Sequence, residues 1–379
     1  MKRLSVLFTV ISLAAACIAT AAPGGGGDRT KTFTVGKGGT LEVTIRGGNI
    51  IINPWDRDEV SVRIKGVDDG EDPALRMVQS GTTVRIEDTD GSSDDLTLDV
   101  SLPSRFDVRL QSSSGDIQVN GPLTGKLKGA TGGGNIRLGN LGGAIDMRTS
   151  GGDITSGDIG GDLDFNTSGG DIHMGTVSGS AAVVTSGGDI TVANVGKRIR
   201  ASTSGGNIAI GDVGGEAIVS TSGGDITAGS VSGSASLTTA GGNILLHGAT
   251  GTVRATSAGG DLQLENVTGA LEGSTAGGNI VAMLNPAKNG RSRLNTAGGD
   301  IRLFVPESAK ATINARIHIG GWWRSRKDSY EIRSDFAMDK YEKDEQSREI
   351  RATILLNGGG EQVTLDAVSG NIEVRKGRP

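Results

Sequence analysis

A column of acidic and amide side chains is the first feature of this 379-residue sequence that could do chemistry. If the chain stacks them, the carboxylates could bind a row of Ca²⁺ ions, a hard cation that takes several oxygen ligands. The candidate ligands are Asp153, Asp171, Asp189, Asp225 and Asp261. Neutral Asn replaces Asp at positions 135, 207, 243 and 279, whereas a turn needs only a short polar side chain that hydrogen-bonds to its own backbone. We therefore expect capped turns, with calcium binding as the alternative.

The other polar side chains do not form a catalytic constellation. His173, His247 and His318 are the only histidines and share no motif. The prominent acids recur throughout the repeats, whereas acid–base catalysis needs a distinctive pair in a cleft. No Gly-x-Ser-x-Gly elbow occurs, and no Lys-Ser/Thr follows the Gly-Gly pairs as in a phosphate-binding loop. We expect a protein that is not an enzyme and uses no cofactor.

Three further residues could bind or carry a group. Trp322 and Trp323 could stack on sugar rings, or they could fill one end of a thin core in a chain with only 3% aromatic residues. Cys17, the single cysteine, follows Ala14-Ala15-Ala16. That context loosely matches the bacterial lipoprotein signal, in which the cysteine is lipid-modified. The alternative is an ordinary cysteine inside a signal peptide.

An 18-residue repeat positions the acidic column. The motif Thr-Ser/Ala-Gly-Gly-Asp/Asn-Ile first reads 149–154. Further copies occupy 167–172, 185–190, 203–208, 221–226, 239–244, 257–262 and 275–280, with looser ones at 114–117 and 296–301. The expected turn residues in three successive copies are Gly151, Gly152 and Asp153; Gly169, Gly170 and Asp171; and Gly187, Gly188 and Asp189.

The apolar residues of each copy predict short strands. With the Asp/Asn position numbered zero, they fall at +1, +3, +6, +10 and +12, as in Ile190, Val192, Val195, Ile199 and Ala201. A spacing of two is typical of strands with one face inward. We expect the glycines at the corners, because glycine accepts positive φ without steric cost.

Stacking of these coils follows from their size. About five small apolar side chains cannot offset the entropy of ordering one coil, so the coils must lie in register about 4.8 Å apart. We predict an all-β protein whose residues 112–301 form a parallel β-solenoid, a β-helix or β-roll of 18-residue coils. Its handedness is left open.

The ends of such a solenoid must be covered, because open edge strands pair with other chains. Residues 22–111 contain alternating segments such as 41–45 and 60–64, which predict an antiparallel-type N-terminal cover. Residues 302–379 predict a C-terminal hairpin cap, in which 350–356 alternates and Gly358-Gly359-Gly360 turns the chain into 363–365.

The N-terminus predicts export. Lys2 and Arg3 precede an apolar run from Leu4 to Ala16, and Ala19-Thr20-Ala21 has the shape of a signal-peptidase site. We expect residues 1–21 to be a signal peptide, since the run is too short for a membrane span. We expect no transmembrane segment in the mature chain.

Loss of Lys2 and Arg3 changes the net charge from −5 to −7, which argues against a nucleic-acid partner.

The chain resembles a known family at several motifs. Val100-Ser101-Leu102-Pro103 leads into Val108-Arg109-Leu110 and then Ser113-Ser114-Gly115-Asp116-Ile117, and Ser369-Gly370-Asn371-Ile372 comes near the end. With the Ser-Gly-Gly-Asp-Ile series, these are similar to the bacterial putative-adhesin β-strand-repeat family, domain of unknown function 4097 (DUF4097). The resemblance spans about 32–375. It implies a cell-envelope or secreted protein without established catalysis, and it brings no functional residues.

We therefore predict a non-catalytic scaffold, adhesin-like and exported to the periplasm, the cell surface or the medium. Its repetitive polar face would bind a cell-surface polymer or another envelope protein. One alternative is a calcium-binding or polysaccharide-processing β-solenoid. Another is an envelope-stress sensor anchored by lipid at Cys17.

Overall fold

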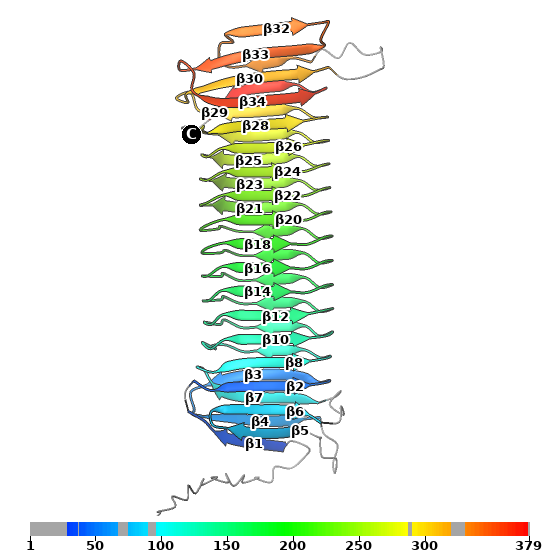
Figure 1. Cartoon of the computed structure of the whole chain (residues 1–379), viewed down its shortest axis with the longest axis vertical. Helices are drawn as coiled ribbons and strands as arrows, with labels where there is room; N and C mark the ends of the chain where they lie inside the picture. The colour runs from blue at the N-terminus through cyan, green and yellow to red at the C-terminus, as the bar shows by residue number, and fades with distance from the viewer. Residues whose placement is uncertain are drawn as a thin grey trace, which may run out of the picture.

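The computed structural model describes residues 29–36, 38–66, 75–89, 96–286, 290–319 and 330–377. These residues form a straight rod of stacked strands, with the first strands at one end and the last at the other (Figure 1). The described residues contain 35 strands and no helix, so they include no helix that could cross a membrane. The predicted signal peptide, Cys17, Trp322 and Trp323 lie outside the described residues.

Each central coil contributes one strand to each of two facing sheets, called sheet A and sheet B. Sheet A contains β9 (Ile117–Val119), β11 (Ile136–Leu138), β13 (Ile154–Ser156), β15 (Ile172–Met174), β17 (Ile190–Val192), β19 (Ile208–Ile210), β21 (Ile226–Val231), β23 (Ile244–Ala249), β25 (Leu262–Val267), β27 (Ile280–Leu284) and β29 (Ile301–Val305). Sheet B contains β8 (Asp107–Ser112), β10 (Leu127–Thr131), β12 (Ile145–Thr149), β14 (Leu163–Asn166), β16 (Ala181–Val184), β18 (Ile199–Ser202), β20 (Ala217–Ser220), β22 (Ala235–Thr238), β24 (Val253–Thr256), β26 (Leu271–Thr275) and β28 (Arg291–Thr296).

The register of the strands confirms the predicted solenoid. Ile172 pairs in parallel with Ile190, and Ile199 of sheet B pairs in parallel with Ala217, so residues 18 apart lie directly over one another. A third column of single bridges runs through the +6 position, for example between Val177 and Val195. Each coil therefore repeats the backbone path of the coil below it.

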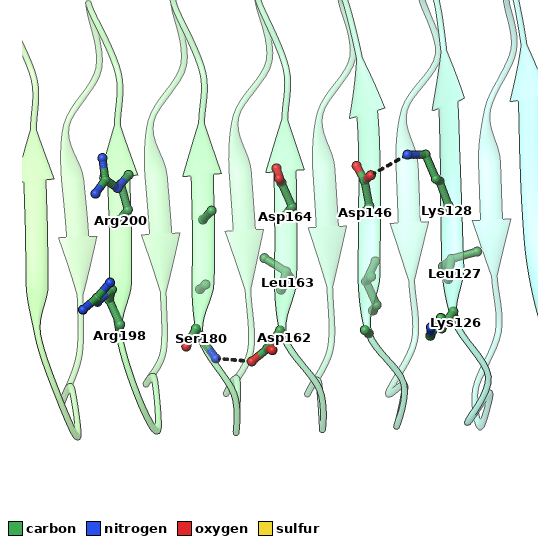
Figure 2. A pocket seen from close by; sticks show the side chains of 14 residues that line it. Lys126, Leu127, Lys128, Asp146, Asp162, Leu163, Asp164, Ser180, Arg198 and Arg200 are labelled. Atoms are coloured by element: carbon green, nitrogen blue, oxygen red, sulfur yellow. Dashed lines mark hydrogen bonds and ion pairs between the residues drawn. The ribbon is translucent and has the colours of Figure 1, made fainter.

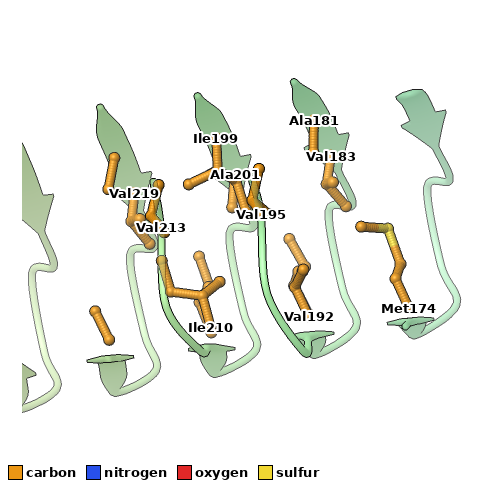
Figure 3. Close-up of a cluster of buried hydrophobic side chains, with 14 of the residues drawn as sticks. Met174, Ala181, Val183, Val192, Val195, Ile199, Ala201, Ile210, Val213 and Val219 are labelled. Atoms are coloured by element: carbon orange, nitrogen blue, oxygen red, sulfur yellow. The ribbon is translucent and has the colours of Figure 1, made fainter. Parts of the chain in front are cut away.

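The core is a thin layer between the two sheets. Ile190, Val192, Val195, Ile199 and Ala201 are all buried, as their spacing predicts. Figure 3 shows this arrangement over successive coils, with side chains from both sheets meeting in the middle. Because like residues stack on like, each coil covers the apolar surface of the next coil and shields it from water.

Glycine is needed in the repeat pairs for a reason other than the positive φ that we expected. Of the described glycines, those with positive φ are Gly38, Gly48, Gly66, Gly81, Gly115, Gly358 and Gly359. Gly48 and Gly115 belong to motif copies at the N-terminal end, but no glycine pair between residues 133 and 299 is among them. A Cβ on Gly152 would instead lie 2.2 Å from the carbonyl oxygen of Gly134, one coil below. A Cβ on Gly170 would lie 2.2 Å from the carbonyl oxygen of Gly152, and a Cβ on Gly188 would lie 2.2 Å from that of Gly170. The second glycine is needed because stacked turns approach too closely for any side chain.

The N-terminal end is interlocked with the solenoid. Its strands are β1 (Arg29–Thr34), β2 (Thr40–Ile45), β3 (Asn49–Trp55), β4 (Glu59–Lys65), β5 (Leu75–Ser80), β6 (Thr83–Asp88) and β7 (Thr97–Pro103). The expected antiparallel pairs are present between β4 and both β1 and β7, and between β5 and β6. However, β2 lies in parallel between β6 and β8, and β3 lies in parallel between β7 and β9. The first coil of the chain is therefore inserted into the stack.

The C-terminal end shows the same arrangement. Its strands are β30 (Ala311–His318), β31 (Ile332–Ser334), β32 (Lys340–Asp344), β33 (Glu349–Leu356), β34 (Glu361–Val368) and β35 (Ile372–Lys376). The cap contains an antiparallel β32–β33 hairpin, and β33 also pairs antiparallel with β30. The last coil is inserted, with β34 between β28 and β30 and β35 between β29 and β31. The turn at Gly358–Gly360 thus joins two strands, β33 and β34, that have β30 between them.

At each end, an acidic side chain joins the inserted strand of sheet B to both of its neighbours. Glu42 of β2 lies 2.7 Å from Arg85 of β6 and 2.8 Å from Arg109 of β8. Hydrogen bonds from Arg85 and then Arg109 hold the pKa of Glu42 below its usual value. At the other end, Asp366 of β34 lies 2.8 Å from Arg293 of β28 and 2.8 Å from Arg316 of β30.

Alanine substitution within one glycine pair tests the close approach of the turns. We expect Gly152→Ala to lower the free energy of unfolding by about 2 kcal/mol, because the overlap with the Gly134 carbonyl must be relieved by backbone movement. Gly151→Ala is the matched control, since its Cβ would lie 3.5 Å from the nearest atom. Thermal and urea unfolding measure both variants. Equal losses of stability would contradict this explanation.

Candidate binding surfaces

The Asp/Asn column forms a ladder of hydrogen bonds along one edge of the rod. The Oδ1 of Asp153 accepts the backbone N–H of Asp171 at 2.9 Å, and the Oδ1 of Asp171 accepts that of Asp189 at 2.8 Å. We expected each side chain to cap its own turn. Instead, each side chain accepts a hydrogen bond from a backbone N–H in the turn of the next coil, and this bond links neighbouring coils.

The ladder reaches both ends of the rod. Asn49 accepts the N–H of Asp116 at 2.8 Å, Asp300 accepts that of Asn371 at 2.7 Å, and Asn371 accepts that of Glu331 at 3.1 Å. Our sequence analysis missed Asn49, although Gly47-Gly48-Asn49-Ile50 carries the repeat motif. The motif lies among the residues that we predicted to be a cover of another kind.

The threonine of the motif is also used in stacking. Thr167 is buried, and its hydroxyl donates to the carbonyl oxygen of Gly152 in the coil below at 2.9 Å. The same hydroxyl accepts the N–H of Gly170 at 3.4 Å. Other side chains at this position that donate to the coil below are Thr131, Thr149, Thr185, Thr203, Thr221, Thr239, Ser257, Thr275 and Thr296. Threonine, glycine and Asp/Asn thus all serve contacts between coils.

The ladder uses one oxygen of each candidate calcium ligand. Each of the five candidate calcium ligands already accepts a backbone N–H, and Asn residues separate Asp189, Asp225 and Asp261 from one another. In the parts of the chain that the structure describes, no three His, Cys, Asp or Glu side chains are grouped so that they could hold a metal.

The histidines occupy three separate places. His173 is exposed on β15. His247 lies 3.2 Å from Glu265, and His318 lies 2.9 Å from Glu349 in the C-terminal cap.

The outer face of sheet A carries an uncharged row that we call the threonine stripe. It consists of the exposed +2 residues of β13 to β21, which are Thr155, His173, Thr191, Ala209 and Thr227. These side chains lie directly over one another in register. Asp and Asn residues of the turns border the stripe on both sides, including Asp153, Asp171, Asp189, Asp158 and Asp212.

The outer face of sheet B is charged and hollowed. A depression of about 500 Å³ extends from β10 to β18. Figure 2 shows Lys126 and Lys128 at one side of it, Asp162 and Asp164 near the middle, and Arg198 and Arg200 at the other side. Lys128 pairs with Asp146 at 3.0 Å.

Comparison with known proteins supports the fold. The family model described as Toastrack DUF4097 matches residues 39–211 and 161–375. No curated protein matches the chain.

Solved structures resemble the chain at low identity. One of a putative adhesin from Parabacteroides distasonis is 12% identical, with 65% of this chain and 98% of that one covered and a TM-score of 0.35. Another of a putative cell adhesion protein from Clostridium sporogenes is 7% identical, with 92% and 99% covered and a TM-score of 0.16. A third, of a putative lipid binding protein from Parabacteroides distasonis, is 12% identical, with 94% and 98% covered and a TM-score of 0.20.

Removing one charge from the ladder tests its electrostatics. Asp171 is stacked between Asp153 and Asp189, so three like charges lie about 4.8 Å apart along the rod. We expect Asp171→Asn to stabilise the fold by about 0.5 kcal/mol, because asparagine keeps the Oδ1 acceptor and removes the repulsion. The gain should shrink as salt rises.

A second aspartate provides the matched control. Asp261 is stacked between Asn243 and Asn279, and Asn279 Nδ2 lies 3.3 Å from its Oδ1. Asp261→Asn should therefore give no stabilisation. Thermal unfolding at low and high ionic strength compares the two variants, and an equal gain in both would refute the role of stacked charge.

Proposed function

Because this chain belongs to the Toastrack DUF4097 family, we propose that it is a non-catalytic, adhesin-like scaffold whose repetitive face binds a cell-surface polymer. The threonine stripe carries this proposal. It presents one exposed side chain per coil, three of them threonines, at intervals of about 4.8 Å. A polymer with its own repeat can make many weak contacts with such a row, and these sum along the rod.

The charges around the stripe favour a neutral polymer. Hydroxyl groups of Thr155, Thr191 and Thr227 can donate and accept hydrogen bonds with sugar hydroxyls. Carboxylates at the two margins, such as Asp189 and Asp212, give this face a negative potential that repels a polyanion. A neutral, hydroxyl-rich polysaccharide fits both features.

Two observations support a role without catalysis. The recurring Asp, Thr and Gly residues of the motif are engaged in hydrogen bonds or close contacts between coils. The three histidines lie apart, on β15, on β23 and at the end of β30.

We also propose the compartment of the protein and the boundaries of its segments. Residues 1–21 would direct export, and Cys17 would carry a lipid anchor in the alternative reading. Residues 22–111 would form the N-terminal cover, residues 112–301 the solenoid and residues 302–379 the C-terminal cap. Trp322 and Trp323 would either fill the end of the thin core or stack on sugar rings.

Charged substitutions in the stripe test the proposal. We expect the protein to co-sediment with at least one insoluble neutral polysaccharide in a panel, and not with polygalacturonate. Thr155→Glu, Thr191→Glu and Thr227→Glu combined should weaken that binding about tenfold, because each rung loses a hydroxyl contact and buries a charge. The matched control combines Ser236→Glu, Thr238→Glu and Thr256→Glu on the outer face of sheet B.

The outcomes separate the candidate functions. Binding that the stripe variant leaves unchanged, or retention by the polyanion alone, would rule out the stripe as the binding face. Binding and unfolding are also measured with Ca²⁺ and with EDTA. A rise of several degrees in melting temperature with Ca²⁺ would favour the calcium-binding alternative.

A further inference from the structure

Opposite charges flank one uncharged strand on the outer face of sheet B. Asp162 and Asp164 belong to the β14 rung, and Arg198 and Arg200 belong to the β18 rung (Figure 2). The strand between them, β16, presents only small or apolar side chains outward, which are Ser180, Ala182 and Val184. In register, Asp164 lies beside Ala182, and Ala182 lies beside Arg200.

These charges are not paired with one another in the described residues. Two rungs place Asp164 and Arg200 about 10 Å apart along the rod. Asp164 has one ion pair in the structure, to Arg148 at 3.9 Å. Arg200 is exposed and makes no ion pair or side-chain hydrogen bond within the described ranges. Arg198 differs, because it pairs with Glu216 at 2.8 Å.

The charge pattern is self-complementary about β16. We propose that this face binds a second copy of the chain. The two rods would be antiparallel, and a two-fold axis parallel to β16 would lie between the two β16 strands. A two-fold axis brings residue i of one copy against residue j of the other and also j against i. Asp164 of each copy then faces Arg200 of the other, and Asp162 faces Arg198.

Apolar contact on the axis adds to the ion pairs. Val184 is an exposed large hydrophobic residue, with 37% of its surface accessible. The axis places Val184 against Val184 of the second copy and Ala182 against Ala182. The small side chains of β16 leave room for the longer Asp and Arg side chains on either side to meet, which matches the depression of about 500 Å³.

The neighbouring rungs are compatible with this arrangement. Lys126 and Lys128, at the β10 rung, would face β22, whose outward side chains include the uncharged Ser236 and Thr238. Glu216, at the β20 rung, would face the β12 rung, which carries Asp146 and Arg148, an ion pair at 3.2 Å. From β10 to β22, no row of like charges would oppose another.

The size of the contact predicts a reversible dimer. Seven rungs of about 4.8 Å and strands of about 15 Å bury roughly 1,000 Å² over both copies. This area lies below the 1,200 to 2,000 Å² that is typical of stable complexes. We expect dissociation in the micromolar range, weakening as salt rises. The two threonine stripes would then lie on opposite outer sides of the dimer.

Charge reversal at the central pair tests the proposal, and sedimentation equilibrium of the purified protein measures it. Arg200→Asp and Asp164→Arg, made separately, should each weaken dimerisation at least tenfold, because like charges then oppose across the axis. The double variant should return to within about threefold of the original affinity. An equimolar mixture of the two single variants should form a heterodimer, since every opposing pair is again opposite in charge.

Control measurements keep the result interpretable. Both residues are exposed, so circular dichroism and melting temperature should be unchanged in the variants. Thr191→Asp on sheet A should leave the dimer intact. A protein that stays monomeric at millimolar concentration would overturn the proposal. A dimer whose affinity none of the charge reversals changes would overturn it too, because a different face would then be in contact.

Discussion

The close stacking of one turn on the next is the constraint on which the rest of this structure depends. The second glycine of each repeat lies so near the carbonyl of the coil below that a Cβ would fall 2.2 Å from it at Gly152 and Gly170. That approach lets the Thr167 hydroxyl reach the Gly152 carbonyl and lets the Asp153 carboxylate receive the N–H of Asp171. The thin apolar core can be small because polar contacts hold each corner.

The same contacts explain how the rod ends. A stack of identical coils would leave open strands, which pair readily with other chains. Here the first and last coils are inserted behind the outermost strands, and Glu42 and Asp366 are each held by two arginines. The outermost strand of sheet B at the C-terminal end, β32, is fully exposed and carries Lys340, Glu342, Lys343 and Asp344. Charges along an edge disfavour further pairing, so contact between copies is directed to the faces.

The repeat predicts much of the fold, and its limits have physical causes. Spacing alone placed Ile172 over Ile190, because the period of the side chains requires the register. It could not reveal that β34 enters between β28 and β30, since insertion depends on pairing across distant segments. The role of the glycines was misread as a need for positive φ, because closeness between coils leaves no trace in one coil's sequence. The charge pattern around β16 became visible only when strands 18 residues apart were neighbours.

Distances between spin labels on the outer face of sheet A test the stacked register most directly. In a Cys17→Ser background, one label replaces Thr155 and the second replaces Thr191, Thr227 or Gln263 in turn. Because each 18 residues advance the chain by one rung, the label separations should be about 10, 19 and 29 Å. A linear rise of about 10 Å for every two coils supports the account. Separations that do not grow in equal steps would contradict it.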